Sequence, residues 1–575
     1  MLPVDARDLI ERVRTSRELR TAPVILELDL TEGVAEATPH DPVSMVLSRH
    51  RPVLRDVVDG LRRAGGDQRV RAVVAKVGGA GIGLARVQEI RDAVAAFRRS
   101  GKPAVAWAES FGDFGPGTVP YYLATAFTEI WLQPSGDLGL TGVASEVSFL
   151  HDALDRAGIV PQVAQRHEYK NAANQFTERD FTPAHREAAQ RLVSSVADQV
   201  VAGVAEARRL DPDAVRAAVD RGPLSGEQAV QAGLVDRLGY RDEVHDAVRD
   251  QVGPGTPLLY LSRYQRTGSA QRARRFTAPA RPVVALVHGT GQIRQGRSGR
   301  GPAGSWMGSS TIAAAVRAAA VDERVKAIVF RVDSPGGSYV ASDTVWREVV
   351  LARRSGTPVV VSMGDVAGSG GYFVSMAADA IVAQPGTLTG SIGVFGGKPV
   401  VRDLLDRFGI TRGVVTAGAH ADMFSTGRPF TEQEWALVND WLDRVYEDFV
   451  TKVGQGRGMT RDQVHEVARG RVWTGADAVE RGLVDELGGL HRAIELASDR
   501  AGLPGGREPE IRVLPRFSPL DRLLPAQSSE DPAAAAARGG SADWGSISGL
   551  AARLGLPDAG PLLMPTGLSP RQPVR

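Results

Sequence analysis

The chain has 575 residues, of which 43% are hydrophobic and 24% charged, as in ordinary globular proteins. This length exceeds what one hydrophobic core usually organises, so we expect several domain-sized units. The 69 basic and 67 acidic residues leave a formal charge of +2, which argues against nucleic-acid binding as the main role. Cysteine is absent, which excludes disulfides, thiolate metal sites and a cysteine nucleophile.

The amino-terminal segment 1–21 mixes acidic and basic side chains. It predicts an amphipathic lead-in helix rather than a signal peptide, which needs an apolar central region. No run of the sequence approaches the roughly 18 apolar residues of a membrane-spanning helix. We therefore expect a cytoplasmic protein without a transmembrane segment, and association with the inner face of the cytoplasmic membrane stays open.

Two halves of the chain repeat one pattern. Residues 70–77 (VRAVVAKV) resemble residues 325–332 (VKAIVFRV) at an offset of 255 positions. Later in each half, residues 224–236 match residues 473–485 at an offset of 249 positions. Short β-branched strands alternate with helical patterns in both halves, which predicts parallel βαβ units and an α/β fold.

Composition indicates the structure of the segments that lie outside or between the repeated strands. Residues 263–280 are rich in Arg, Ser, Thr and Ala and predict a linker, and the glycine-rich and arginine-rich segment 294–304 predicts a mobile loop. Beyond about residue 505, Pro, Ala, Gly and Ser dominate, which predicts a disordered tail. The expected organisation is a lead-in helix (1–21), a first repeat (22–260), a linker (261–280), a second repeat (281–505) and a low-complexity tail (506–575).

A glycine-rich stretch at 364–373 contains the main candidate for a nucleophile. The apolar run 357–363 predicts a buried strand before it, and residues 372–379 predict a helix after it. Ser369 would then lie at a strand-to-helix turn, where glycines allow unusual backbone angles and free N–H groups lie near the hydroxyl. An N-cap serine at an ordinary glycine-rich turn fits this stretch equally well.

Two further turns could complete such a site. A DSPGG motif follows a predicted strand, so its Gly336 and Gly337 are candidate oxyanion donors, together with the N–H of Gly370. A simple Pro-Gly turn explains the motif as well. Ser391, in a later turn of small residues, could orient a general base or cap the next element.

These motifs together resemble the signal peptide peptidase A (protease IV) family of Ser-Lys peptidases, in its long, duplicated form. The motifs are DSPGG, AGSGGY at 367–372, LTGSIG at 388–393 and WTG at 473–475, and the similarity covers nearly all of 22–500. The resemblance implies two tandem ClpP/crotonase-like repeats and a nucleophile at Ser369. It also implies a general base in the first half, where the family's Tyr-Lys motif falls on Lys170.

The repeat supports this assignment independently. The positions equivalent to Lys170 lie within 419–421, which contain no lysine, and Thr118 occupies the position equivalent to Ser369. One composite site, with its serine from the second half and its lysine from the first, is the simplest account. His420 lies in the same window and is an alternative base from the same half as the serine.

A lysine base must be neutral. The ordinary lysine pKa is about 10.4, and lowering it by about three units requires roughly 4 kcal/mol, which burial can supply. We therefore expect Lys170 in an apolar pocket, hydrogen-bonded to Ser369 and Ser391. A solvated surface lysine is the ordinary alternative.

We predict a serine endopeptidase with a Ser-Lys dyad that degrades cleaved signal peptides and other short hydrophobic or unfolded peptides. No cofactor and no metal are expected, and the partners are peptide substrates rather than nucleic acid. The family resemblance implies a homo-oligomer, a tetramer, that needs no ATPase partner. A crotonase-like acyl-CoA enzyme and a catalytically inactive scaffold are the alternatives, because the same fold and Gly-Gly turn also serve thioester chemistry.

Overall fold

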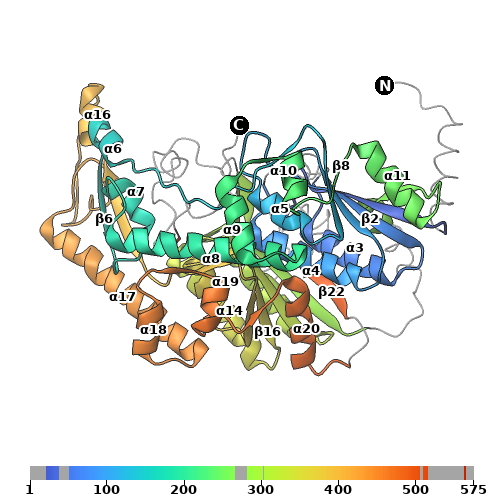
Figure 1. Ribbon diagram of the computed structural model, residues 1–575. Helices are drawn as coiled ribbons and strands as arrows, with labels where there is room; N and C mark the ends of the chain where they lie inside the picture. Colours follow the sequence, from blue (N-terminus) through green and yellow to red (C-terminus); the bar gives the residue numbers. More distant parts are fainter. Residues whose placement is uncertain are drawn as a thin grey trace, which may run out of the picture. The chain divides into compact units, whose positions relative to one another are not determined.

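The computed structural model (Figure 1) describes residues 21–37, 51–79, 81–265, 281–301, 304–504, 509–515 and 562–564. The predicted lead-in helix and most of the predicted linker and tail lie outside these residues. Within them the chain forms two compact units, which are described separately. The first contains the residues up to 144 and from 196 to 265, and the second contains 145–195 and the residues from 281 onward.

The first unit is built on a six-stranded parallel sheet with the order β8-β4-β3-β2-β1-β9. Its strands are β1 (Val24–Asp29), β2 (Val70–Lys76), β3 (Ala104–Ala108), β4 (Glu129–Leu132), β5 (Asp137–Leu138), β7 (Leu224–Ser225), β8 (Arg237–Leu238) and β9 (Leu258–Tyr260). Its helices are α3 (Leu54–Gly66), α4 (Leu84–Arg98), α5 (Thr118–Ala124), α9 (Pro212–Arg221), α10 (Gly226–Gln231) and α11 (Arg241–Val252). Helix α8 (Pro183–Arg208) includes the position at which the two units divide.

The second unit has a larger sheet with the order β20-β18-β16-β14-β10-β22, and β17 and β21 extend it beside β16. Its strands are β6 (Val160–Gln165), β10 (Val283–Thr290), β11 (Gln292–Arg294), β12 (Gly299–Gly301), β13 (Gly304–Gly308), β14 (Val325–Ser334), β15 (Gly336–Gly337), β16 (Val359–Gly368), β17 (Ala380–Ala383), β18 (Leu388–Gly390), β19 (Phe395–Val400), β20 (Val472–Thr474), β21 (Glu486–Leu487), β22 (Glu510–Leu514) and β23 (Leu562–Leu563). Its helices are α6 (His151–Ala157), η1 (Asn171–Ala173), α7 (Asn174–Thr177), α13 (Ser309–Val321), α14 (Tyr339–Arg354), α15 (Gly370–Phe373), α16 (Arg402–Arg407), α17 (Glu432–Arg457), α18 (Arg461–Val467), α19 (Gly475–Glu480) and α20 (Leu490–Arg500).

Both faces of the second sheet are buried, which explains its continuous apolar strands. In β10, Val283 and Val287 belong to the large core on one face, whereas Val284 and Leu286 belong to a smaller core on the other. Successive side chains of a strand point to opposite faces, so an uninterrupted apolar run fills both layers. Helix α20 covers the second face with residues that include Leu490.

The strand order confirms the predicted duplication. In the second unit the series β21-β17-β16-β14-β10-β22 repeats the order β8-β4-β3-β2-β1-β9 of the first. The short antiparallel pair β5–β7 likewise has its counterpart in β18–β20. The chain therefore contains two tandem α/β repeats of one topology, as the sequence predicted.

One segment of the first sequence repeat is part of the second compact unit. Residues 145–195 group with the second unit, where β6 forms an antiparallel ribbon with β19 over six residue pairs, from Val160↔Val400 to Gln165↔Phe395. Lys170 lies shortly after β6, which ends at Gln165. The ribbon thus brings a residue of the first repeat into the unit that contains Ser369.

Three local predictions differ from the structure. The predicted mobile loop 294–304 contains β12, which pairs with β13, because Trp306 packs on this hairpin and its Nε1 donates to Arg297 O at 2.8 Å. The predicted helix 372–379 is a single turn, α15, because Asp379 N already donates to Val359 O at 2.8 Å at the start of the next strand. Within the predicted tail, β22 adds a parallel edge strand beside β10.

Candidate functional site

Ser369 lies at the junction between β16 and α15, as the sequence predicted. It is fully buried, and its φ of 54° is a left-handed conformation that residues other than glycine rarely adopt. The backbone N–H of Ser369 donates to Gly390 O at 2.8 Å, which ties the turn to β18. Backbone strain of this kind persists where the surroundings enforce it, and it often marks a functional position.

Lys170 lies beside this serine. Its side chain is fully buried, and its Nζ lies 2.7 Å from Ser369 Oγ, 3.0 Å from Ser391 O and 3.1 Å from Ser391 Oγ. Removal from water disfavours the ammonium form, so burial holds the pKa of Lys170 well below its ordinary value. The surface alternative for this lysine is wrong, because the side chain has no exposure to solvent.

Two glycines make room for Lys170. A Cβ on Gly470, whose φ is 85°, would lie 2.5 Å from Lys170 N and 2.6 Å from its Cα, and a Cβ on Gly393 would lie 3.2 Å from Lys170 Cδ. The neighbouring Tyr169 N donates to Arg469 O at 3.2 Å. The turn around Gly470 therefore fixes the backbone of the lysine as well as enclosing it.

The sequence analysis did not single out Gly470. The repeat contained a signal for it, because at the offset of 249 positions Gly470 corresponds to Arg221. The first repeat thus has a large side chain where the second has none. A comparison of the two repeats for glycines present in only one of them would have pointed to this position.

Ser391 belongs to the same cluster. It also has a positive φ, of 51°, and its N–H donates to Arg471 O at 2.7 Å. This backbone conformation directs both its carbonyl oxygen and its hydroxyl to Lys170. The two oxygens provide Lys170 with hydrogen-bond acceptors in a site closed to water.

The Gly336-Gly337 turn lies against the start of α15. Their φ angles are 100° and 154°, and a Cβ on Gly370 would lie 3.0 Å from both Gly336 Cα and Gly337 N. The three candidate oxyanion glycines are therefore neighbours. The N–H of Gly336 donates to Ser334 Oγ at 3.1 Å.

His420 and Thr118 have polar partners of their own. His420, the alternative base, has a side chain that is 42% exposed, and its Nδ1 lies 3.6 Å from a carboxylate oxygen of Glu434. In the first unit, Thr118 is buried and its hydroxyl donates to Gly142 O at 2.9 Å. The structure therefore pairs Lys170, and not His420, with Ser369.

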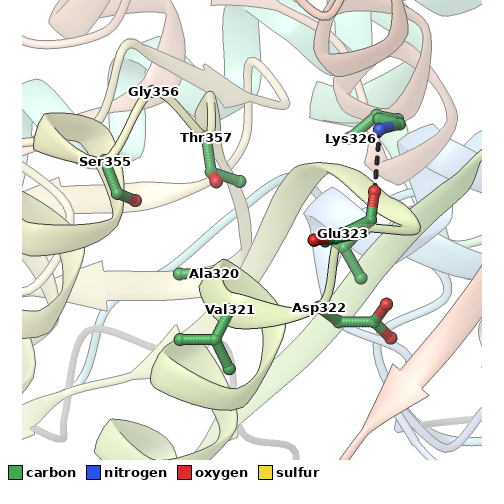
Figure 2. A pocket seen from close by; sticks show the side chains of 9 residues that line it. Ala320, Val321, Asp322, Glu323, Lys326, Ser355, Gly356 and Thr357 are labelled. Carbon is green, nitrogen blue, oxygen red and sulfur yellow. Dashed lines mark hydrogen bonds between the residues drawn. The ribbon is translucent and has the colours of Figure 1, made fainter.

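A hollow of about 490 Å³ occurs elsewhere in the second unit (Figure 2). It is lined by residues that include Asp322, Lys326 and Thr357, at the start of β14 and before the start of β16. Ser369 follows the opposite end of β16, so this hollow is not part of the site. Among the described residues, no group of three or more side chains is suited to hold a metal ion.

Comparisons with known proteins follow this geometry. The profile of peptidase family S49 matches residues 96–253 and 351–504, one match in each repeat. The chain is 31% identical over 458 residues to the chloroplastic serine protease SPPA of Arabidopsis thaliana, covering 79% of this chain and 67% of that protein. It is 32% identical over 459 residues to protease 4 of Salmonella typhi, covering 78% of this chain and 72% of that protein. Protease 4 of Haemophilus influenzae is 31% identical over 457 residues, with 77% and 72% covered.

These similarities extend through both repeats, and they are consistent with a buried serine and lysine in hydrogen-bonding distance. They confirm the resemblance to the long, duplicated signal peptide peptidase A form, the two tandem α/β repeats and the prediction of a serine peptidase that acts on peptides. The chain belongs to peptidase family S49.

Proposed function

We propose that the chain is a serine endopeptidase in which Ser369 is the nucleophile and Lys170 the general base. The observation that carries this proposal is the distance of 2.7 Å between Lys170 Nζ and Ser369 Oγ in a fully buried site. A neutral amine has two N–H bonds and one lone pair. The two Ser391 oxygens can accept both N–H bonds, which leaves the lone pair for the hydroxyl proton of Ser369.

The reaction follows from these positions. Ser369 Oγ attacks the scissile carbonyl carbon while its proton passes to Lys170 Nζ. The N–H groups of Gly370 and of the Gly336-Gly337 turn stabilise the oxyanion. Lys170 then returns the proton to the leaving amine, and an acyl-enzyme remains on Ser369. Water, deprotonated by Lys170, hydrolyses this ester and regenerates the hydroxyl.

The proposed substrates are cleaved signal peptides and other short hydrophobic or unfolded peptides. The edge of the Gly336-Gly337 strand can pair with an extended backbone, and a folded protein seldom offers one. Apolar side chains of Leu388, Val472 and Leu192 form a small cluster in the same unit. Membership of family S49 favours this reading over acyl-CoA chemistry.

We also propose a homo-oligomer, a tetramer by family resemblance. Large apolar side chains are exposed around the β6–β19 ribbon and α16, with Phe408 74%, Phe424 75% and Val415 102% exposed. Figure 1 shows α16, α6 and β6 close together. Exposed apolar side chains of this size are typical of a protein interface. Loss of the oligomer in Val415→Asp, measured by light scattering, would support this surface; an unchanged mass would exclude it.

We propose a cytoplasmic location, with contact to the inner face of the cytoplasmic membrane as its extension. In the described part of the chain, no helix combines the length and the apolar character that crossing a bilayer requires. Fractionation of cells that express the full chain would test the proposal. Recovery of the chain in the periplasmic or extracellular fraction would contradict it.

Active-site labelling tests the catalytic assignment. A fluorophosphonate probe should modify Ser369, which peptide mapping identifies, and Ser369→Ala should be unlabelled and inactive. Lys170→Ala should be unlabelled on the same time scale, because the serine and its base act as a unit. His420→Ala is the matched control and should retain wild-type labelling. Labelling of another residue, or an active Ser369→Ala, would overturn the assignment.

A further inference from the structure

An arginine near the base joins two segments of the site. Arg471 immediately precedes β20, and its carbonyl oxygen accepts the N–H of Ser391 at 2.7 Å. Its Cζ lies 4.9 Å from the ring centroid of Tyr169 and 4.3 Å from that of Trp473. Tyr169 directly precedes Lys170. One residue therefore contacts both the segment that carries the base and the turn that provides its hydrogen-bond acceptors.

The position of the guanidinium follows from the strand. Arg471 and Trp473 are two residues apart, so their side chains point to the same face. A planar guanidinium in contact with two aromatic rings gains cation–π attraction from each of them. Its Nη2 also donates to Glu187 Oε1 at 2.6 Å. A carboxylate of helix α8 thus fixes the guanidinium beside the rings.

Glu187 connects this guanidinium with the tyrosine. Burial raises the pKa of Tyr169, and a hydrogen bond between its hydroxyl and Glu187 raises it further. The Arg471 side chain is 16% exposed, and its Nε is buried without a hydrogen-bond partner among the described residues. A buried, unpaired N–H is costly, so the contacts with the rings and the carboxylate must outweigh that cost.

The first repeat lacks this arrangement although it forms the equivalent strand. At the offset of 249 positions, Gly222 corresponds to Arg471. Leu224 likewise corresponds to Trp473. β7, which begins at Leu224, pairs with β5 as β20 pairs with β18. The strand pairing therefore needs neither the arginine nor the tryptophan, and the repeat that has both is the one that contacts Lys170.

We propose that Arg471 is a positioning residue that holds Lys170 in line with its serine. It acts through Tyr169 on one side and Ser391 on the other, rather than on the reacting atoms. The inference rests on the proposed Ser-Lys mechanism for its effect on the rate. Without Arg471 the two segments should move apart and admit water. The pKa of Lys170 should then move up toward its ordinary value, because burial is what lowers it.

The kinetic test compares Arg471→Met with wild type, using the full chain and an unstructured fluorogenic peptide. The kcat should fall on the order of 30-fold, less than the roughly 100-fold loss for a 1 Å displacement of a catalytic group. The KM should stay unchanged. The pH at which fluorophosphonate labelling of Ser369 reaches half its maximal rate should rise, which a mere loss of stability would not cause. Wild-type kcat and midpoint in Arg471→Met would overturn the proposal.

Arg481→Met is the matched control. Arg481 Cζ lies 3.9 Å from the ring centroid of the same Trp473, and its Nη1 donates to Asp477 O at 2.7 Å, in α19. This variant removes a comparable cation–π contact and should keep the wild-type kcat and midpoint. Arg471→Lys retains the charge near Glu187 without the planar group, so it should recover part of the kcat. If Arg481→Met lost as much kcat as Arg471→Met, general packing of Trp473 would explain the loss and the proposal would fail.

A measurement without catalysis separates this inference from the proposed function. Lys170 binds its proton less tightly in the folded chain, so it makes the free energy of unfolding rise with pH. Comparing each chain with its Lys170→Met version, by urea unfolding at several pH values, isolates this contribution. It should be smaller in Arg471→Met than in wild type and unchanged in Arg481→Met, even if the chain hydrolysed no peptide. An equal contribution in Arg471→Met and wild type would refute the positioning role, whatever the kcat.

Discussion

The Gly470→Ala substitution tests whether the position of Lys170 limits catalysis. The new Cβ would lie 2.5 Å from Lys170 N and 2.6 Å from both Lys170 Cα and Lys170 Cβ. Carbon atoms in contact are normally about 3.5–4.0 Å apart. The backbone around Lys170 must therefore move by about 1 Å, because no side-chain rotation can relieve a contact with main-chain atoms.

A displacement of this size has a calculable effect. Misplacing a catalytic group by about 1 Å costs on the order of 100-fold in rate. The φ of 85° at Gly470 adds strain of about 1–2 kcal/mol for an alanine, which should appear as lower stability. We therefore expect Gly470→Ala to fold, to unfold at lower urea concentration and to lose about 100-fold in kcat/KM.

Gly458→Ala is the matched control. Gly458 caps α17 with a φ of 66°, and its Cβ would have no neighbour within 4 Å. It should share the strain and the loss of stability but keep the activity. The assay compares kcat/KM on a fluorogenic peptide with the rate of fluorophosphonate labelling and with urea unfolding. If Gly470→Ala retained the activity of Gly458→Ala, the packing of Gly470 against Lys170 would not position the base.

Four further predictions concern Lys170 and its surroundings. The kcat/KM of the wild-type chain should rise with pH, because desolvation lowers the pKa of Lys170 and the neutral base forms below the usual lysine range; a rate that falls over the same pH range would contradict a lysine base. The unfolded chain binds the proton of Lys170 more tightly than the folded chain, so the free energy of unfolding should also rise with pH between the folded and unfolded pKa values of this lysine. Lys170→Met should remove that rise, as measured by urea unfolding at several pH values. Ser391→Ala should lower kcat/KM about tenfold, since one acceptor for Lys170 Nζ worth about 1.4 kcal/mol is lost, and an unchanged pH profile and rate would exclude its supporting role. A chain cut at a protease site inserted between 266 and 280 should remain active while its two fragments stay associated. The isolated segment 281–575 should be inactive because it lacks Lys170. Activity of that segment alone would show that the base lies elsewhere.

Much of this arrangement could be predicted from the sequence because the repeat is a long-range signal. The apolar strands and the offsets between the halves predicted the tandem sheets, and the glycines around Ser369 predicted a strand-to-helix turn. The missing lysine at 419–421 pointed to Lys170 in the other half. Each of these inferences compares residue types at fixed spacing, which a sequence contains directly.

The features that the sequence did not predict depend on contacts between residues far apart in the chain. The glycines in 294–304 indicate a loop, and no local sequence pattern there indicates a strand. The hairpin depends on the packing of Trp306, whose indole N–H donates to Arg297 O. The tail composition hid β22, because Ile511 and Val513 are too few to stand out until β10 offers them a sheet edge. Leu562–Leu563 pair with β15 for the same reason. Short strands of this kind gain their stability from the edge they join, and the sequence does not state where that edge lies.

In the proposed mechanism, the position of Lys170 explains why duplication led to one site rather than two. Residues 145–195 belong to the first repeat in sequence but form the β6–β19 ribbon within the second compact unit. Once this segment supplies Lys170 to Ser369, a lysine at 419–421 has no base role, and His420 there faces Glu434. In the first unit, Thr118 has no such partner, and its hydroxyl donates to Gly142 O. The placement of residues 145–195 in the second unit therefore accounts both for the missing lysine at 419–421 and for the missing serine at position 118. Thr118→Ser alone should create no second nucleophile.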